Sequence, residues 1–419
     1  MKVNHGRTLA SFVAAAFVLA ACGNSTTTST SHLPTGPVTM GVLSCFTGPL
    51  SGLGAAMLQG SQVALKAIND GGGILGQQLQ LQHADTQCDE ADGTVATRQL
   101  LANSNVVGII GPETQEIAAV SPIVTSAKVT TQFQGGSTKF DTNASQYLWR
   151  DSPSDSQLGV AMALYAFNKG YKKADLIFYS DIAAQTFPPP ITATFTKLGG
   201  TVIKNYIITG GQTSYLTTVR QVIADQPDVI FTQTDPPTAA VLFRNFKSLD
   251  NLAIPFVGTD VTGFSDYMKA ITWQVAHDHL TSVYGVSVSG AATDEFNRLF
   301  AIVVTGAGQQ ALAGANYAYD AVISQALAID KAKSILGPDI NAAMTSVTNP
   351  PGTQCYTYKS CLDLINAGTK INYDGASGPL DYNQYHNVFG PYAAFQQSLD
   401  GKQVQVALMD AAALGAATP

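Results

Sequence analysis

Short apolar runs alternate with segments of helical periodicity along most of the chain, and this alternation restricts the fold more than any other feature. Val106–Ile110 indicates a buried strand, Ile117–Ala127 a helix and Val129–Phe133 the next strand. Strands separated by helices of about 10–15 residues form βαβ units, in which the strands lie parallel and the helices cover the sheet. The pattern therefore predicts an α/β protein with parallel sheets.

The alternation occurs in two series, and a length of 419 residues also favours two or three domains. The first series predicts strands and helices at Val38–Leu43, Ala55–Asp70, Leu79–Leu81, Val95–Leu101, Val106–Ile110, Ile117–Ala127 and Val129–Phe133. The second predicts Leu158–Asn168, Leu176–Tyr179, Ile191–Leu198, Val202–Ile208, Tyr215–Ala224, Val229–Thr232, Ala239–Leu249 and Ile254–Val257. Two later helices, Asp294–Val304 and Tyr317–Ser334, precede an extended end from Ile371 to Leu408. We expect these helices to pack on the first sheet, which makes both lobes discontinuous.

Charged residues are scarce, at 12% of the chain against a usual value of about 25%. The 22 basic and 29 acidic side chains give a net charge of −7. A chain of this kind lacks the basic surface that binds nucleic acid, and it lacks a polybasic patch for anionic lipid. We therefore expect neither a nucleic-acid partner nor a membrane surface bound through charge.

The first residues have the pattern of an export signal. Lys2 and Arg7 precede the apolar run Leu9–Leu19, which is too short to span a bilayer. The sequence Leu19-Ala20-Ala21-Cys22-Gly23 resembles a bacterial lipobox, so residues 1–21 are expected to be a lipoprotein signal peptide and Cys22 the lipidated residue. The alternative is plain secretion with an incidental cysteine. Small polar residues at 22–36 predict a flexible tether, and the protein is expected on the extracytoplasmic face of the bacterial membrane.

Four cysteines remain after Cys22, and an exported protein can join them in disulfides. Three pairings are possible, of which we favour Cys45–Cys88 and Cys355–Cys361. No pair has CxxC spacing, which argues against zinc binding. His277 and His279 are interpreted as a strand end or a surface pair, and no metal site is predicted.

Several short motifs occur in a recognisable order: Gly48-Pro49-Leu50, Gly72-Gly73-Ile74-Leu75-Gly76, Gly108–Pro112, Ser121-Pro122-Ile123, Gly258-Thr259-Asp260 and Gly378-Pro379-Leu380. From about residue 37 to 408 the chain resembles type I periplasmic binding proteins of the leucine/isoleucine/valine class, the solute receptors of ABC importers. The resemblance implies two Rossmann-like lobes with parallel sheets, joined by three crossovers near 152, 286 and 377. The N-terminal lobe would hold residues 37–152 and 287–377, and the C-terminal lobe residues 153–286 and 378–411.

Two positions could hold the opposite charges of an amino acid. Thr114 and Gln115 precede a helix that begins near Glu116, and free N–H groups at a helix N-terminus bind a carboxylate. The alternative role of Thr114 is to cap that helix. Asp260 matches the acidic position that pairs with the α-ammonium in this family, because a desolvated ammonium needs an anionic partner. The alternative for Asp260 is a helix cap or a turn residue.

Other expected contacts rest on the alignment. Gly136 and Thr138 fall on the family's carbonyl and hydroxyl contacts, with Ser137 between them, although an ordinary glycine turn is the simpler interpretation. The loop after Tyr179 lacks the family's frequent aromatic residue and offers Ala184 instead. Leu53 stands where an aromatic often covers the ligand, and Phe46 is a substitute candidate. Asp235 is either an acidic contact or a turn residue before two prolines.

The sequence contains no GxSxG, P-loop or HExxH motif, so no catalytic residue and no cofactor are predicted. The resemblance implies a monomeric solute-binding protein that takes a small amino acid or a related compound and delivers it to an ABC permease. Alternatives are a ligand-sensing receptor lipoprotein and a binder of an amide, urea, a polyamine or an aromatic carboxylate. An exported enzyme on the same fold is the remaining alternative.

Overall fold

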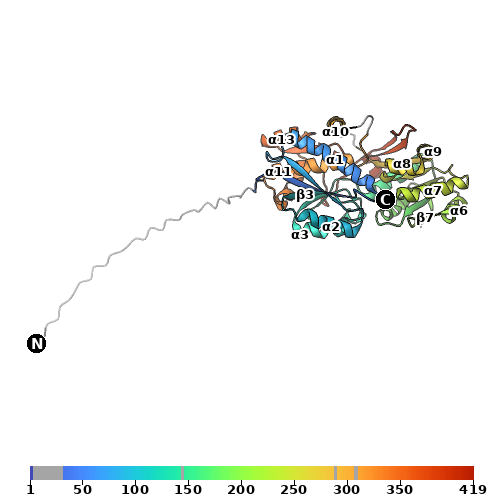
Figure 1. Ribbon diagram of the computed structural model, residues 1–419, viewed down its shortest axis with the longest axis horizontal. Coiled ribbons are helices and arrows are strands. Elements are labelled where there is room, and N and C mark those ends of the chain that lie inside the picture. The colour runs from blue at the N-terminus through green and yellow to red at the C-terminus, as the bar shows by residue number, and fades with distance from the viewer. Residues whose placement is uncertain (3–31, 143–145, 287–289, 306–309) are drawn as a thin grey trace. The chain divides into compact units, whose positions relative to one another are not determined.

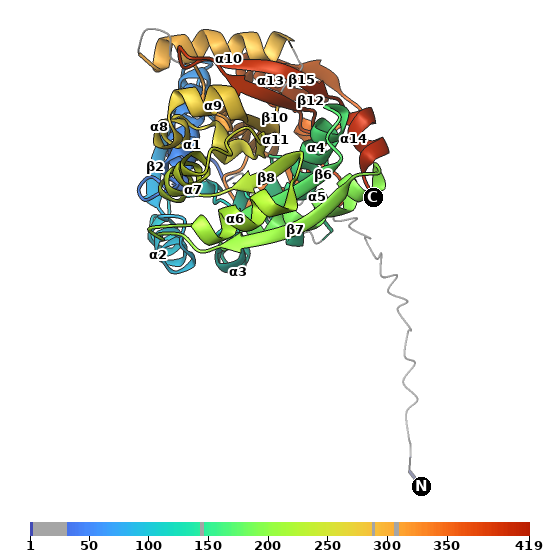
Figure 2. The same ribbon diagram turned by 90° about the vertical axis from the view of Figure 1, so that its right-hand side faces the viewer.

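The computed structural model describes residues 1–2, 32–142, 146–286, 290–305 and 310–419. Residues His32–Pro419 form one compact unit, which contains the three sheets of the described residues (Figures 1 and 2). All but the first two residues of the predicted signal peptide, the predicted lipidation site Cys22 and most of the predicted tether lie outside the described residues. The end of that tether is described, and its His32 carbonyl accepts a hydrogen bond of 3.0 Å from the Ile335 N–H.

The first lobe is built on a parallel sheet with the strand order β2-β1-β3-β4-β5. Its strands are β1 Val38–Ser44, β2 Leu79–Asp85, β3 Val106–Ile110, β4 Thr130–Phe133 and β5 Leu148–Arg150. One face carries α1 Ser51–Asp70, α11 Ala315–Ala332, α12 Gly337–Thr348 and α13 Tyr358–Asn366, and the other carries α2 Glu90–Leu101 and α3 Ile117–Ala127 (Figure 1). The late helices therefore pack on the first sheet, as the sequence predicts.

A close approach of α1 to α11 fixes this packing. A Cβ at Gly60 of α1 would overlap the carbonyl oxygen of Ala315, so only glycine lets the two backbones meet at this distance. The helices α12 and α13 were not among the predicted elements. A small sheet of β11 Thr353–Cys355, β12 Ile371–Gly375 and β13 Gly378–Pro379 completes this lobe.

The second lobe is built on a seven-stranded sheet with the order β15-β14-β10-β9-β8-β6-β7. The strands β6 Lys173–Tyr179, β7 Thr201–Ile208, β8 Val229–Gln233, β9 Phe256–Gly258 and β10 Leu280–Gly285 run parallel. The strands β14 Tyr392–Gln397 and β15 Gln403–Met409 are added antiparallel at one edge. The expected extended C-terminal end is therefore partly sheet and partly loop.

Helices cover both faces of the second sheet as well. One face carries α4 Asp155–Asn168, α5 Pro188–Lys197 and α14 Ala411–Ala417, and the other carries α6 Leu216–Asp225, α7 Pro236–Ser248, α8 Ser265–Ile271 and α9 Trp273–His279. The short α14 lies beside α4 at the end of the chain (Figure 2). Because His277 and His279 lie on α9, they do not end a strand. No described helix combines the length and hydropathy needed to cross a membrane.

The chain passes between the lobes after β5, after β10 and again before β14. The second passage precedes α10 Gly290–Val303, and residues 287–289 lie outside the described part. Leu380, Tyr382 and Val388 pack in the core of the first lobe, whereas Tyr392 packs in that of the second. The third passage therefore lies between Val388 and Tyr392, later than the expected position near 377.

Candidate functional site

A cleft lies where loops from the carboxyl ends of both parallel sheets meet, which is where ligands bind in open α/β folds. Its volume is about 100 Å³, and residues of both lobes line it. The lining residues are Leu53, Ala56, Glu113, Thr114, Gln115, Gln134, Gly136, Ser152, Pro153, Asp155, Leu158, Ala183, Phe187, Gln233, Asp260, Val261, Tyr284, Gly285, Ala313, Gly314, Tyr317 and Tyr392.

The loop between β3 and α3 presents polar groups to the cleft. The Thr114 hydroxyl accepts a hydrogen bond of 2.7 Å from the Gly136 N–H, which joins this loop to the loop after β4. Thr114 is therefore not the cap of α3, whose N-cap is Glu116. The Gln115 side chain is only 8% exposed, and neither its amide nor the N–H groups of Thr114 and Gln115 have a hydrogen-bond partner among the described residues. These unused donors can receive an anionic group of a ligand.

Three carboxyl groups line the same cleft, from Glu113, Asp155 and Asp260. Burial, together with the nearby charges of Glu116 and Asp260, raises the pKa of Glu113 to about 8. Burial likewise raises the pKa of Asp155 to about 7 and raises the pKa of Asp260 above its ordinary range. The empty cleft is thus a poor environment for negative charge, and it would gain from a cationic partner.

Asp260 opens the short turn η3 Asp260–Gly263 at the carboxyl end of β9. The preceding residue, Thr259, donates a hydrogen bond of 2.6 Å to the Gln233 side-chain oxygen, which ties this loop to the end of β8. Asp260 is therefore held by a turn on the second lobe, and it faces the same cleft as the α3 loop of the first lobe.

Aromatic side chains line the cleft, although they come from positions that the sequence analysis did not single out. They are Phe187, Tyr284, Tyr317 and Tyr392. The Tyr284 ring stacks on Phe395 with centroids 4.2 Å apart. The Tyr317 hydroxyl occupies the space that a Cβ at residue 285 would need, so the glycine there admits the ring.

Five of the predicted contacts line the cleft, namely Leu53, Thr114, Gln115, Gly136 and Asp260. The Gly136 carbonyl already accepts from the Asp155 N–H at 2.8 Å and from Arg150 Nη1 at 3.3 Å. Its expected role as a free carbonyl acceptor for the ligand therefore has two protein competitors.

The other five predicted contacts do not line the cleft. The Asp235 carboxylate accepts from the Thr238 N–H at 2.8 Å and caps α7, which agrees with the turn alternative. Phe46 packs edge-on against the His83 ring, and Ala184 is fully buried in the second-lobe core. The Ser137 carbonyl accepts a hydrogen bond from Arg150, and Thr138 is the first residue of the turn η1 Thr138–Phe140.

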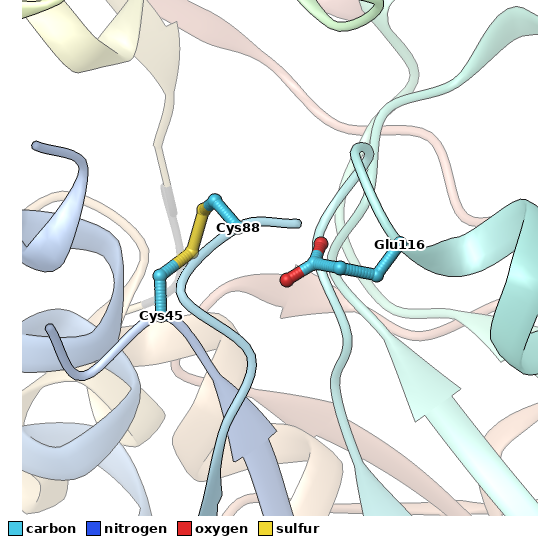
Figure 3. Close-up of side chains that lie close together, drawn as sticks. All are labelled: Cys45, Cys88 and Glu116. Carbon is cyan, nitrogen blue, oxygen red and sulfur yellow. A yellow bond between two sulfur atoms is a disulfide. The ribbon is translucent and has the colours of Figure 1, made fainter. Parts of the chain in front are cut away.

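Both predicted disulfides are present, Cys45–Cys88 and Cys355–Cys361. The first joins the loops that follow β1 and β2, close to Glu116 at the start of α3 (Figure 3). The two sulfurs and the Glu116 carboxylate could suggest a metal site, but sulfurs bonded to each other provide no thiolate ligand.

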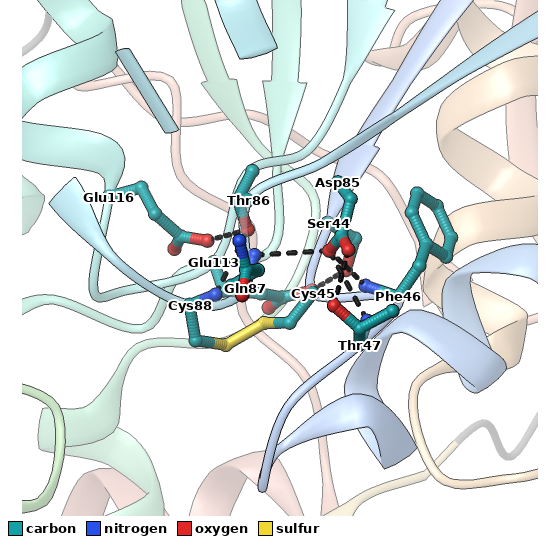
Figure 4. The surroundings of a disulfide bond; sticks show 10 residues. All are labelled: Ser44, Cys45, Phe46, Thr47, Asp85, Thr86, Gln87, Cys88, Glu113 and Glu116. Carbon is teal, nitrogen blue, oxygen red and sulfur yellow. Dashed lines mark hydrogen bonds between the residues drawn. A yellow bond between two sulfur atoms is a disulfide. The ribbon is translucent and has the colours of Figure 1, made fainter. Parts of the chain in front are cut away.

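A hydrogen-bond network surrounds the first disulfide and reaches the cleft (Figure 4). The Thr86 hydroxyl donates to the Glu116 carboxylate, and the Ser44 hydroxyl donates to Glu113 at 3.2 Å. Asp85 accepts from the N–H groups of Phe46 and Thr47. Hydrogen bonds thus connect the residues next to the disulfide with the loop that carries Glu113 and Thr114.

Comparison with known proteins places this geometry in a family. A sequence profile of the periplasmic binding protein family matches residues 37–356. A chemotactic signal transduction system substrate-binding protein, BasB of Halobacterium salinarum, is 26% identical over 364 residues, which are 82% of this chain and 83% of the relative.

Two solved structures show the same fold. A leucine-binding protein LivK of Thermotoga maritima superposes with a TM-score of 0.76 at 19% identity, over 90% of this chain and 99% of that one. An ABC-transporter solute-binding protein of R. palustris in complex with benzoate has a TM-score of 0.71 at 17% identity, over 92% and 97%. The chain belongs to the periplasmic binding protein family and has the type I fold of that family.

Proposed function

We propose that the protein is the extracytoplasmic solute-binding component of an ABC importer and captures a small amino acid, or a close relative of one, between its lobes. The observation that carries this proposal is the pairing of opposite binding groups across one cleft. The first lobe offers the unused donors of Thr114 and Gln115, and the second lobe offers the Asp260 carboxylate.

A zwitterion matches this arrangement physically. Its carboxylate would accept from the N-terminal region of α3, and its ammonium would pair with Asp260. Each buried charge then has a partner, which removes the cost of several kcal/mol that an unpaired charge carries. The cleft of about 100 Å³ lies between the two lobes, so its volume would change with the hinge between them.

Closure of the two lobes over the ligand would complete the site, because the donors of Thr114 and Gln115 lie on one lobe and the Asp260 carboxylate lies on the other. Hinge closure around a ligand is the common motion of such two-lobed receptors. The closed form would present a surface that an ABC permease recognises. We further propose that Cys22 carries a lipid that holds the protein at the membrane, where the permease lies.

Two alternative functions have specific support. The name of the Halobacterium relative includes chemotactic signal transduction, which favours a receptor that reports the ligand to a signalling partner. The R. palustris protein binds benzoate, a carboxylate without an ammonium. The three carboxyl groups in this cleft argue against a ligand of that kind.

A thermal-shift screen of the purified protein tests the proposal. The panel holds amino acids, short amides, urea, polyamines and aromatic carboxylates. A ligand at about 1,000 times its dissociation constant adds about 4 kcal/mol of stability and raises the midpoint by several degrees. A shift with amino acids supports the proposal. A shift confined to carboxylates or amides without an ammonium contradicts it and removes Asp260 from its assigned role.

A further inference from the structure

The cleft contains more acidic groups than a neutral amino acid can pair. One ammonium needs one carboxylate, and Asp260 supplies it under the proposed function. Glu113 and Asp155 remain, and the described lining residues include no lysine, arginine or histidine. Two buried carboxyl groups are costly to ionise when no basic residue lines the cleft, so their presence calls for an explanation.

Glu113 has an unused oxygen. Its side chain is only 6% exposed, and one carboxylate oxygen accepts from the Ser44 hydroxyl at 3.2 Å. The other oxygen has no donor among the described residues. The charged groups that face Glu113 are Glu116, Asp260 and Asp151, all acidic.

Asp155 is placed in a similar way. Oδ2 accepts from the Thr186 hydroxyl at 2.7 Å, whereas Oδ1 lies over Gly136, in the space that a Cβ there would occupy. The like charges of Asp260 and Asp141 raise the pKa of Asp155. Among the described groups, Arg150 is the single cation that lowers this pKa.

Arg150 does not line the cleft, and its two terminal nitrogens donate to other groups, while its buried Nε has no hydrogen-bond partner among the described residues. Nη2 donates to Asp141 at 2.6 Å, and Nη1 donates to the carbonyls of Gly136 and Ser137 at 3.3 and 3.0 Å. The guanidinium therefore fixes the loop after β4 through these hydrogen bonds, and Arg150 is not among the residues that line the cleft.

Unpartnered amide groups in this cleft point independently to a polar ligand. The Gln115 side chain, 8% exposed, lines the cleft without a hydrogen bond among the described residues, and the buried Gln134 Nε2 also lacks an acceptor. Both can donate to a ligand carboxylate. Tyr317 and Tyr392 line the same space, and an aromatic ring can contact a cation.

We propose that the ligand is an amino acid whose side chain ends in a second cationic group, an ammonium or a guanidinium. Asp260 pairs with one cation, Glu113 and Asp155 pair with the other, and the α3 loop with Gln115 and Gln134 receives the carboxylate. This inference rests on the proposed function and narrows its ligand class.

Ligand binding is then linked to proton release. The pKa of Glu113 is raised to about 8 and that of Asp155 to about 7, so both groups hold much of their proton in the empty cleft at neutral pH. An arriving cation favours their ionised forms. Affinity therefore rises with pH between about 6 and 8, by up to about tenfold per pH unit for each proton released.

Titration calorimetry with matched ligands tests the inference. Lysine is compared with norleucine, arginine with citrulline, and lysine with cadaverine, which lacks the carboxylate. At pH 8 we expect the cationic member of at least one amino-acid pair to bind about tenfold tighter or more, and cadaverine to bind more weakly than lysine. In two buffers of different ionisation enthalpy, the cationic ligand should release protons and its neutral partner should not.

The possible failures are distinguishable. If neutral amino acids bind as tightly as cationic ones, or more tightly, the second cation site is refuted and the proposed function stands. If cadaverine binds more tightly than lysine, the carboxylate contacts are refuted. If no amino acid binds, the proposed function itself fails.

Variants locate the effect. Glu113→Gln and Asp155→Asn should each reduce the preference for the cationic member of a pair towards unity. Asp266→Asn, an exposed carboxylate outside the cleft, is the matched control and should preserve the preference. An unchanged preference in both cleft variants would overturn the assignment, and the ligand series on the unmodified protein remains decisive if a variant fails to fold.

Discussion

Replacing Glu113 with glutamine is expected to stabilise the empty protein at neutral pH. Burial raises the pKa of the Glu113 carboxyl from 4.5 to about 8, so the folded protein keeps a proton that the unfolded chain releases above about pH 4.5. The free energy of unfolding therefore falls as pH rises from about 4.5 to 8. Each pH unit costs about 1.4 kcal/mol, and by pH 7 the loss is about 3 kcal/mol.

Glutamine removes this cost because it is nearly isosteric and does not ionise. Its side-chain oxygen can still accept the hydrogen bond from the Ser44 hydroxyl. Midpoints of thermal unfolding at pH 4.5, 6 and 7.5 measure the effect for the wild type and Glu113→Gln. The two proteins should coincide at the lowest pH, and the variant should become progressively more stable above it.

Glu90→Gln is the control, since Glu90 is exposed at the start of α2. Its effect should stay within about 0.5 kcal/mol across the same pH range. The opposite result is a midpoint of Glu113→Gln that is no higher than that of the wild type at pH 7.5, with the same difference between the two proteins at pH 4.5. That result would refute the claim that Glu113 is buried in its neutral, protonated form.

Three further changes test the structure around the cleft. Serine at both Cys45 and Cys88, which are 43 residues apart, should cost about 4 kcal/mol and lower the thermal midpoint, whereas an unchanged midpoint would contradict the disulfide. Gly136→Ala should weaken ligand binding about tenfold or more in calorimetry, because its Cβ would overlap the Asp155 carboxylate, and wild-type affinity would refute that contact. Asp320→Asn should cost about 2 kcal/mol in denaturant unfolding, since the Asp320 carboxylate accepts from Tyr373, Ala376 and Ser377; no loss would show those hydrogen bonds to be dispensable.

Local patterns in the sequence predict most of the central fold. Val106–Ile110 and Ile117–Ala127 occur at the predicted bounds, because a short apolar run and an amphipathic segment each reflect local burial. The helices α12 and α13 were missed because they lie between the late long helix and the extended end, where no alternation of strand and helix was visible. The third crossover also lies later than predicted, since Val388 packs in the first lobe through contacts remote in sequence.

The site shows the same limit. Thr114 could be proposed because it precedes a helix N-terminus, which is a local signal, and because of the family resemblance, whereas Asp260 was proposed from the resemblance. Tyr317 and Tyr392 reach the cleft from α11 and β14, and Asp155 reaches it from the first crossover. These side chains meet only because segments distant in sequence pack together in the fold. The local periodicity of apolar residues does not indicate which distant segments pack together.

The most direct test of the account is the affinity of Asp260→Asn for the amino acid that the screen identifies, measured by titration calorimetry beside the wild type. Removing one partner of a buried charge pair typically costs about 2–5 kcal/mol, so affinity should fall by at least about thirtyfold. The exposed Asp266→Asn variant should bind as the wild type does. An affinity of Asp260→Asn within about twofold of the wild type, well under 1 kcal/mol, would show that the ligand's ammonium is held elsewhere.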